Sequence, residues 1–177
     1  MKSRIIVFFS ILICSMQVYA GEPSFGPAIE GYGPTYPIDD RDVALRKNFV
    51  YNAVFDAAAN PDETALNTGL VSVARYLNMH ARNGVPPDNM NVAVVAHGPA
   101  LKTMLSDDAY RARYGIDNPN SELLQKLHSA GVSFYVCGQS VAFGGFKKEE
   151  LLHPAKVALS AMTMLTELQT DGYALLR

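Results

Sequence analysis

The stretch Val132-Ser133-Phe134-Tyr135-Val136-Cys137-Gly138-Gln139-Ser140 contains the features that decide the fold. Residues 132–137 are rich in β-branched and aromatic side chains, which favour a buried strand. Gly138-Gln139-Ser140 follows at once and suits the start of a helical turn. A strand that leads directly into a helix is typical of α/β folds.

The same alternation of strand and helix recurs along the chain. Residues 92–95 are nearly continuous in apolar side chains, which indicates a strand buried on both faces, as in a parallel sheet. The sequence therefore predicts a three-layer α/β sandwich with a mainly parallel five-stranded sheet and right-handed crossovers. Strands are expected at 48–56, 90–96, 132–137, 156–160 and 173–176.

Two Asn-Pro pairs predict where helices begin. Asn60-Pro61-Asp62-Glu63 offers a cap, a proline for the first turn and a capping-box acid ahead of the periodic apolar residues 66–81. Asn118-Pro119 repeats the signal before a helix expected at 121–130.

Residues 1–20 fit a secretory signal peptide. Lys2 and Arg4 precede the apolar run 5–13, and Val18-Tyr19-Ala20 fits cleavage near Ala20-Gly21. The sequence therefore predicts an exported, periplasmic protein with no membrane segment after cleavage.

Residues 21–46 form a Gly/Pro-rich arm with no periodic apolar face. It is either a loosely ordered leader or an arm that lies on a surface through Phe25, Tyr32 and Tyr36. The α/β domain is expected to occupy residues 47–177.

Charge and motifs exclude several classes of function. Loss of Lys2 and Arg4 takes the formal net charge from −2 to −4, and no basic cluster remains, so nucleic acid is not an expected partner. The sequence contains neither a Walker nor a GxGxxG pattern, so a nucleotide or flavin cofactor is not expected. No two histidines stand at the spacing of metal ligands and the sequence has no CxxC pair, so a metal site is not expected.

Cys137 is the principal site candidate because it is the only cysteine outside residues 1–20. It ends a strand, and ligands of parallel sheets collect at that edge. Backbone N–H groups of Gln139, Ser140 and Val141 are expected to face its sulfur and favour the thiolate. Gly138 is expected to allow a sharp turn and to leave room for a second sulfur atom. The alternative is an inert core cysteine.

His97 closes the second strand at the same edge and is a candidate acid, base or anion-binding partner. With the common strand order 2-1-3-4-5, the first strand would separate it from Cys137 by roughly 10 Å. The alternative is a loop histidine bonded to backbone.

Four stretches of the chain match a known family as a set, namely 94–100, 118–120, 131–140 and 156–161. Through them the chain resembles the DsrE/DsrF-like sulfur-relay family over about residues 47–177. The resemblance implies a flavodoxin-like fold without bound flavin, and trimers or hexamers. It also implies that the cysteine at the position of Cys137 accepts sulfur as a persulfide and passes it to a partner.

These observations predict an exported sulfur-handling protein, a carrier rather than a high-turnover enzyme. Cys137 would load sulfane sulfur with Gly138, Gln139, Ser140 and His97 in support, and would pass it to the thiol of a partner protein. One alternative is an oligomeric module for a small ligand or protein, with Cys137 structural. Another is a thiol-dependent reductase or hydrolase that uses His97.

Overall fold

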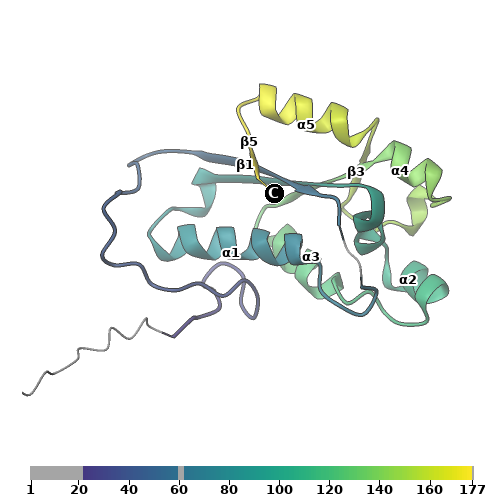
Figure 1. Cartoon of the computed structure of the whole chain (residues 1–177), viewed down its shortest axis with the longest axis horizontal. Helices are drawn as coiled ribbons and strands as arrows, with labels where there is room; N and C mark the ends of the chain where they lie inside the picture. Colours follow the sequence, from purple (N-terminus) through teal and green to yellow (C-terminus); the bar gives the residue numbers. More distant parts are fainter. Residues whose placement is uncertain (1–21, 60–61, 177) are drawn as a thin grey trace, which may run out of the picture.

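Five parallel strands form the sheet at the centre of the molecule (Figure 1). This computed structural model describes residues 22–59 and 62–176, so the expected signal peptide lies outside the described residues. The predicted α/β sandwich with its parallel five-stranded sheet is confirmed. The strands are β1 (Tyr51–Ala57), β2 (Met90–Ala96), β3 (Ser133–Cys137), β4 (Lys156–Ala158) and β5 (Ala174–Leu176).

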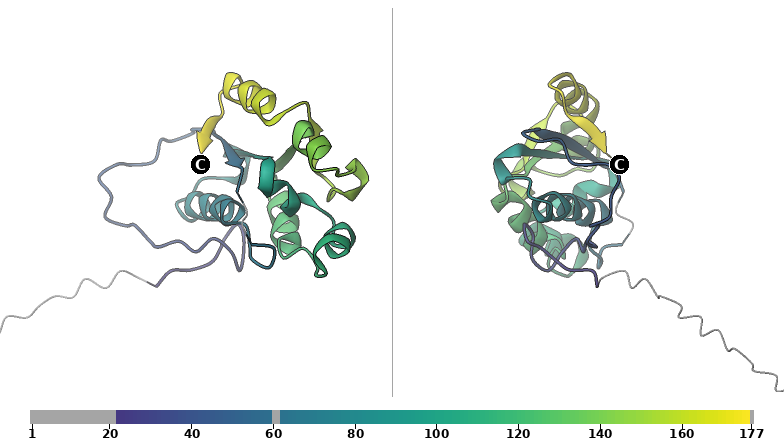
Figure 2. Two further views of the ribbon diagram at one scale, coloured as in Figure 1. Left: turned by 45° about the vertical axis from the view of Figure 1, so that its right-hand side comes forward. Right: turned by 90° about the vertical axis from the view of Figure 1, so that its left-hand side faces the viewer.

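Helices cover both faces of the sheet and make the three layers (Figures 1 and 2). On one face lie α1 (Thr68–Arg82) and α3 (Ser121–Ser129), and on the other lies α5 (Ala161–Thr170). The remaining helical segments are η1 (Pro87–Asn89), η2 (Gly98–Met104), α2 (Asp107–Tyr114), α4 (Gly138–Phe143) and η3 (Lys148–Glu150).

The two faces of the sheet differ in the size of their apolar clusters. The face under α1 and α3 carries the larger core, in which side chains such as Leu70, Leu123 and Leu127 are fully buried. Each such leucine contributes about 2 kcal/mol to folding. The α5 face carries a smaller cluster that includes Cys137 and Ala161. The site candidate thus lies under the single helix α5.

The strand order is β4-β3-β2-β1-β5, which differs from the common order 2-1-3-4-5 that was considered for the position of His97. β2 lies between β1 and β3, because the chain steps in one direction from β1 to β4 before it returns to pair β5 with β1. Right-handed crossovers in one direction place their helices on one face, and the return crossover places its helix on the other. The order therefore explains why α5 alone covers its face.

Helix α1 begins at Thr68, so the start expected at Asn60-Pro61 is wrong. Asn67 is the cap, and its Oδ1 accepts hydrogen bonds from Gly69 N and Leu70 N at 2.8 and 3.4 Å. The side chain of Glu63 instead accepts a hydrogen bond from Lys102 at 2.7 Å. A tertiary contact has thus taken the acid that the local pattern assigned to a capping box.

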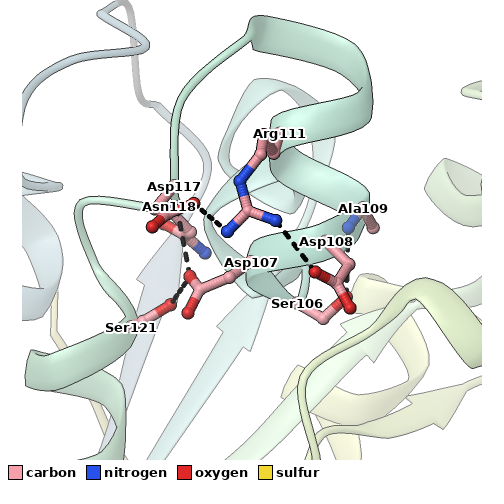
Figure 3. A network of polar contacts seen from close by, with 8 residues as sticks. All are labelled: Ser106, Asp107, Asp108, Ala109, Arg111, Asp117, Asn118 and Ser121. Atoms are coloured by element: carbon pink, nitrogen blue, oxygen red, sulfur yellow. Dashed lines mark hydrogen bonds and ion pairs between the residues drawn. The ribbon is translucent and has the colours of Figure 1, made fainter.

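Helix α3 begins at Ser121 as predicted, but Asn118 serves another element. Its Nδ2 donates to Thr103 O and Leu105 O, both at 2.8 Å, which fixes the end of η2. Asp107 accepts hydrogen bonds from Asn118 N and Ser121 Oγ (Figure 3). Polar side chains therefore hold the loops at the carboxyl edge of the sheet.

The arm packs on α1 through residues 22–35, and residues 36–48 then arch away, exposed, toward β1 (Figure 1). Ile29 is buried, whereas Phe25 and Tyr36 are exposed. Asn78 of α1 is 0% exposed and holds the arm. It accepts from Ile29 N at 2.7 Å and donates to Ile29 O, Tyr32 O and Gly33 O at 3.1, 2.9 and 3.1 Å.

Replacement of Asn78 should release the arm. Asn78→Ala leaves the buried Ile29 N–H without its partner, and we expect the free energy of unfolding to fall by about 2 kcal/mol. Denaturant unfolding gives this change, and limited proteolysis should show faster cleavage within residues 22–35. Asn91→Ala, at an exposed asparagine, should change neither. Unchanged cleavage in Asn78→Ala would contradict this anchoring role.

Candidate functional site

Cys137 lies at the carboxyl edge of the sheet, where two helices begin beside it. It is the last residue of β3 and the N-cap of α4. It pairs in register with Ala158 of β4, and α5 starts three residues later at Ala161. Cys137 as a whole is only 6% exposed and packs in the cluster under α5.

Hydrogen bonds to the sulfur outweigh the effect of burial on its ionisation. Burial alone raises the pKa of the Cys137 thiol, because it disfavours the charged thiolate. The Ser140 hydroxyl, the strongest opposing contact, lowers that pKa, as does the Ser140 backbone N–H. N–H groups of Ala161 and Gln139 act in the same direction, and the resulting pKa is below that of an ordinary thiol. The site therefore favours a buried thiolate.

The donors match the expectation in part. Gln139 and Ser140 contribute N–H groups as expected, while the third N–H comes from Ala161 rather than from Val141. Ala161 is the first residue of α5, so the sulfur is contacted by the opening turns of two helices. No local pattern around Cys137 could have identified this donor, because it is brought in by the pairing of β3 with β4.

Ser140 links the thiol to the loop after β2. Its Oγ accepts a hydrogen bond from Gly98 N at 3.0 Å. A hydroxyl can accept one hydrogen bond and still donate its proton elsewhere, so this contact is compatible with donation to Cys137.

Gly138 has a different role from the one expected. A Cβ on Gly138 would lie 2.6 Å from Ala158 O, so the glycine permits close approach of α4 to the end of β4. The position that a side chain of residue 138 would occupy is filled by the backbone of residues 158 and 159. Gln139 Nε2 donates to Leu159 O at 3.4 Å, which also ties α4 to this segment.

His97 is nearer to Cys137 than the expected strand order implied, because β2 is the direct neighbour of β3. Ala96 pairs with Val136, so the residues that follow them end adjacent strands. The Nε2 atom of His97 lies 2.7 Å from Asp56 Oδ1, on β1. Asp56 was not predicted as a site residue, although an acid at the carboxyl end of a buried strand can indicate one.

A cavity of about 700 Å³ lies beside Ser140 and Gly98, between η2, α2 and α4. Lys102, only 8% exposed, forms an ion pair with Glu63 in its wall. The hydrogen bond from Lys102 lowers the pKa of the Glu63 carboxyl. The other walls of the cavity include Tyr114, Phe143 and Phe146. Lys102 is the single charged residue in the mainly apolar run 100–105, a pattern that can indicate a functional side chain but was not used to predict one.

Within residues 22–59 and 62–176, no three His, Cys, Asp or Glu side chains are grouped so that they could hold a metal ion.

Removal of the Ser140 hydroxyl should raise the pKa of Cys137 toward that of an ordinary thiol. Near neutral pH, Ser140→Ala should contain less thiolate than the parent, and at strongly alkaline pH the two should be equal. Ultraviolet absorbance of the thiolate across a pH titration measures this, in a Cys14→Ser background that leaves one thiol. Gln139→Ala is the matched control, because Gln139 contacts the sulfur through its backbone. An unchanged titration in Ser140→Ala would contradict the assigned hydrogen bond.

Comparisons with known proteins agree with this architecture. A search of the curated proteins finds no match. MTH1491 from Methanobacterium thermoautotrophicum is similar with a TM-score of 0.56 and 22% identity, over 72% of this chain and 98% of that one. The ychN protein from E. coli is similar with a TM-score of 0.52 and 13% identity, over 71% of this chain and 97% of that one. These similarities show a shared fold. The model of the DsrE/DsrF-like family matches residues 50–177, and the chain therefore belongs to this family.

Proposed function

We propose that this protein is an exported sulfur carrier whose Cys137 accepts sulfane sulfur as a persulfide. The observation that carries the proposal is the polar environment of the sulfur, in which one hydroxyl and three backbone N–H groups lower the pKa of the thiol. Membership in the DsrE/DsrF-like family is consistent with sulfur relay in general. A thiolate is the form of cysteine that attacks sulfur.

Loading and transfer each exchange one sulfur–sulfur bond. The Cys137 thiolate attacks the outer sulfur of a donor R–S–SH, the donor's S–S bond breaks, and R–S⁻ leaves. The product is Cys137–S–SH, which the same donors can stabilise in its anionic form. A second thiolate then attacks the outer sulfur and regenerates the Cys137 thiolate. No net oxidation occurs, because sulfane sulfur only changes its partner.

Export and assembly belong to the same proposal. The apolar run 5–13 and the small residues before Gly21 support export to the periplasm. In the described part of the chain, no helix has the length and apolarity needed to cross a membrane. We also propose a homo-oligomer, a trimer or hexamer, supported by exposed apolar side chains such as Phe143 at the end of α4, which is 97% exposed. Light scattering of the purified protein measures this assembly.

One observation favours a second candidate, a binding module in which Cys137 is structural. The thiol is buried in an apolar cluster, as inert cysteines commonly are. The cavity beside Ser140 would then hold the ligand. The two candidates differ in the reactivity of the folded protein toward a sulfur donor.

Incubation with a persulfide donor should add one sulfur atom, roughly 32 Da, to the folded protein. Intact-mass measurement should show this gain in the Cys14→Ser background, its reversal by a reductant, and its absence from Cys14→Ser/Cys137→Ser. Thermal unfolding of the two proteins should be similar, since serine keeps the size of the side chain. If the thiol gains no sulfur until the protein is denatured, the binding module becomes the better account.

A further inference from the structure

Asp56, His97 and Cys137 come from the carboxyl ends of three adjacent strands. β1 pairs with β2, and β2 pairs with β3. Asp56 is the penultimate residue of β1, and His97 follows the last residue of β2. The register that pairs Ala96 with Val136 places His97 and Cys137 one residue further along their strands.

The three side chains also share one face of the sheet. Val54, Val95 and Cys137 pack together under α5. Side chains two residues apart in a strand point to the same face, which places Asp56 with Val54 and His97 with Val95. The backbone of His97 is extended, with φ −151° and ψ 171°, so the alternation continues to it. The contact between Asp56 and His97 agrees with this placement.

The contact with Asp56 holds one ring nitrogen of His97 and leaves the other available to exchange a proton. Nε2 is held 2.7 Å from Asp56 Oδ1, and the side chains of His97 and Asp56 are 30% and 21% exposed. Among the described residues, Asp56 is the partner of the ring, so Nδ1 is the nitrogen placed to exchange a proton. A carboxylate on one nitrogen orients the imidazole, as in other proton-transfer sites.

His97 is not the group that ionises Cys137. The hydrogen bonds that lower the pKa of the thiol come from Ser140, Ala161 and Gln139. Neighbouring strands lie about 4.8 Å apart. Because His97 and Cys137 follow paired residues of β2 and β3 on one face of the sheet, the imidazole lies next to the sulfur that carries the exchange.

We propose that His97 is the proton carrier of the sulfur exchange and that Asp56 is its positioning residue. This inference rests on the proposed persulfide chemistry of Cys137. During loading, protonated His97 gives its proton to the R–S⁻ that leaves the donor. During transfer, neutral His97 takes the proton of the acceptor thiol R′–SH, whose thiolate removes the outer sulfur from Cys137. Over one cycle R–S–SH and R′–SH become R–SH and R′–S–SH, and the protons balance.

The chemistry of the leaving thiol provides a test that a structural role would not satisfy. An alkyl thiolate is a poor leaving group and benefits from a proton, whereas an acidic aromatic thiolate leaves without one. Two reagents separate the cases. The persulfide of N-acetylcysteine releases an alkyl thiolate, and dithiobis(nitrobenzoate) releases an aromatic thiolate.

His97→Gln in the Cys14→Ser background should slow loading from the alkyl persulfide by about 100-fold, the usual scale of general acid catalysis. Its rate with dithiobis(nitrobenzoate) should stay within about twofold of the parent, because attack by the thiolate needs no proton. Asp56→Asn should show the same donor dependence with a smaller loss. Time courses of intact mass give the first rate, and absorbance of the released thiolate gives the second.

Asn52→Ala is the matched control, since the Asn52–Asn91 pair joins β1 to β2 at the opposite end of the same strands, with Nδ2 and Oδ1 2.8 Å apart. It should affect neither rate. The assignment is overturned if His97→Gln and Asp56→Asn slow the reactions with the two reagents equally. It is also overturned if these variants slow neither reaction. Both outcomes leave the carrier function standing. Failure of the parent protein to load from the persulfide would instead overturn the carrier function, and this inference with it.

Discussion

The convergence of hydrogen-bond donors from α4 and α5 on the sulfur of Cys137 is the constraint on which the site depends. β3 and β4 are parallel neighbours, so they end at the same edge of the sheet and release their helices there. The first turns of helices have N–H groups without intrahelical partners. At Cys137 such groups are directed at a sulfur atom that is shielded from water.

Burial and reactivity are therefore not opposites at this cysteine. Removal of water alone disfavours a thiolate, but fixed N–H and O–H donors replace the hydration that is lost. Ser140 lowers the pKa of the thiol most strongly, and its oxygen also accepts a hydrogen bond from Gly98 N. A thiol with low exposure can thus have a lowered pKa inside the fold, so burial does not by itself decide between the reactive and the structural interpretation of Cys137.

The strand order connects the fold to the rest of the site. Because the chain steps from β1 to β4 in one direction, the ends of β1, β2 and β3 are successive neighbours. The return crossover places α5 on the face where Asp56, His97 and Cys137 lie. The same topological choice thus supplies the helix that contacts the sulfur and the adjacency of three ionisable side chains.

The sequence by itself determined the parallel α/β sandwich, the limits of most strands and the position of Cys137 where β3 meets α4, because these follow from local periodicity and from glycine and proline positions. Only the tertiary structure decided the strand order, the start of α1 and the partners of the sulfur. Ala161 and Asp56 are distant from Cys137 in the chain, and Glu63 left its local capping role for Lys102. Contacts between distant segments depend on how crossovers pack on the sheet, which no local pattern encodes.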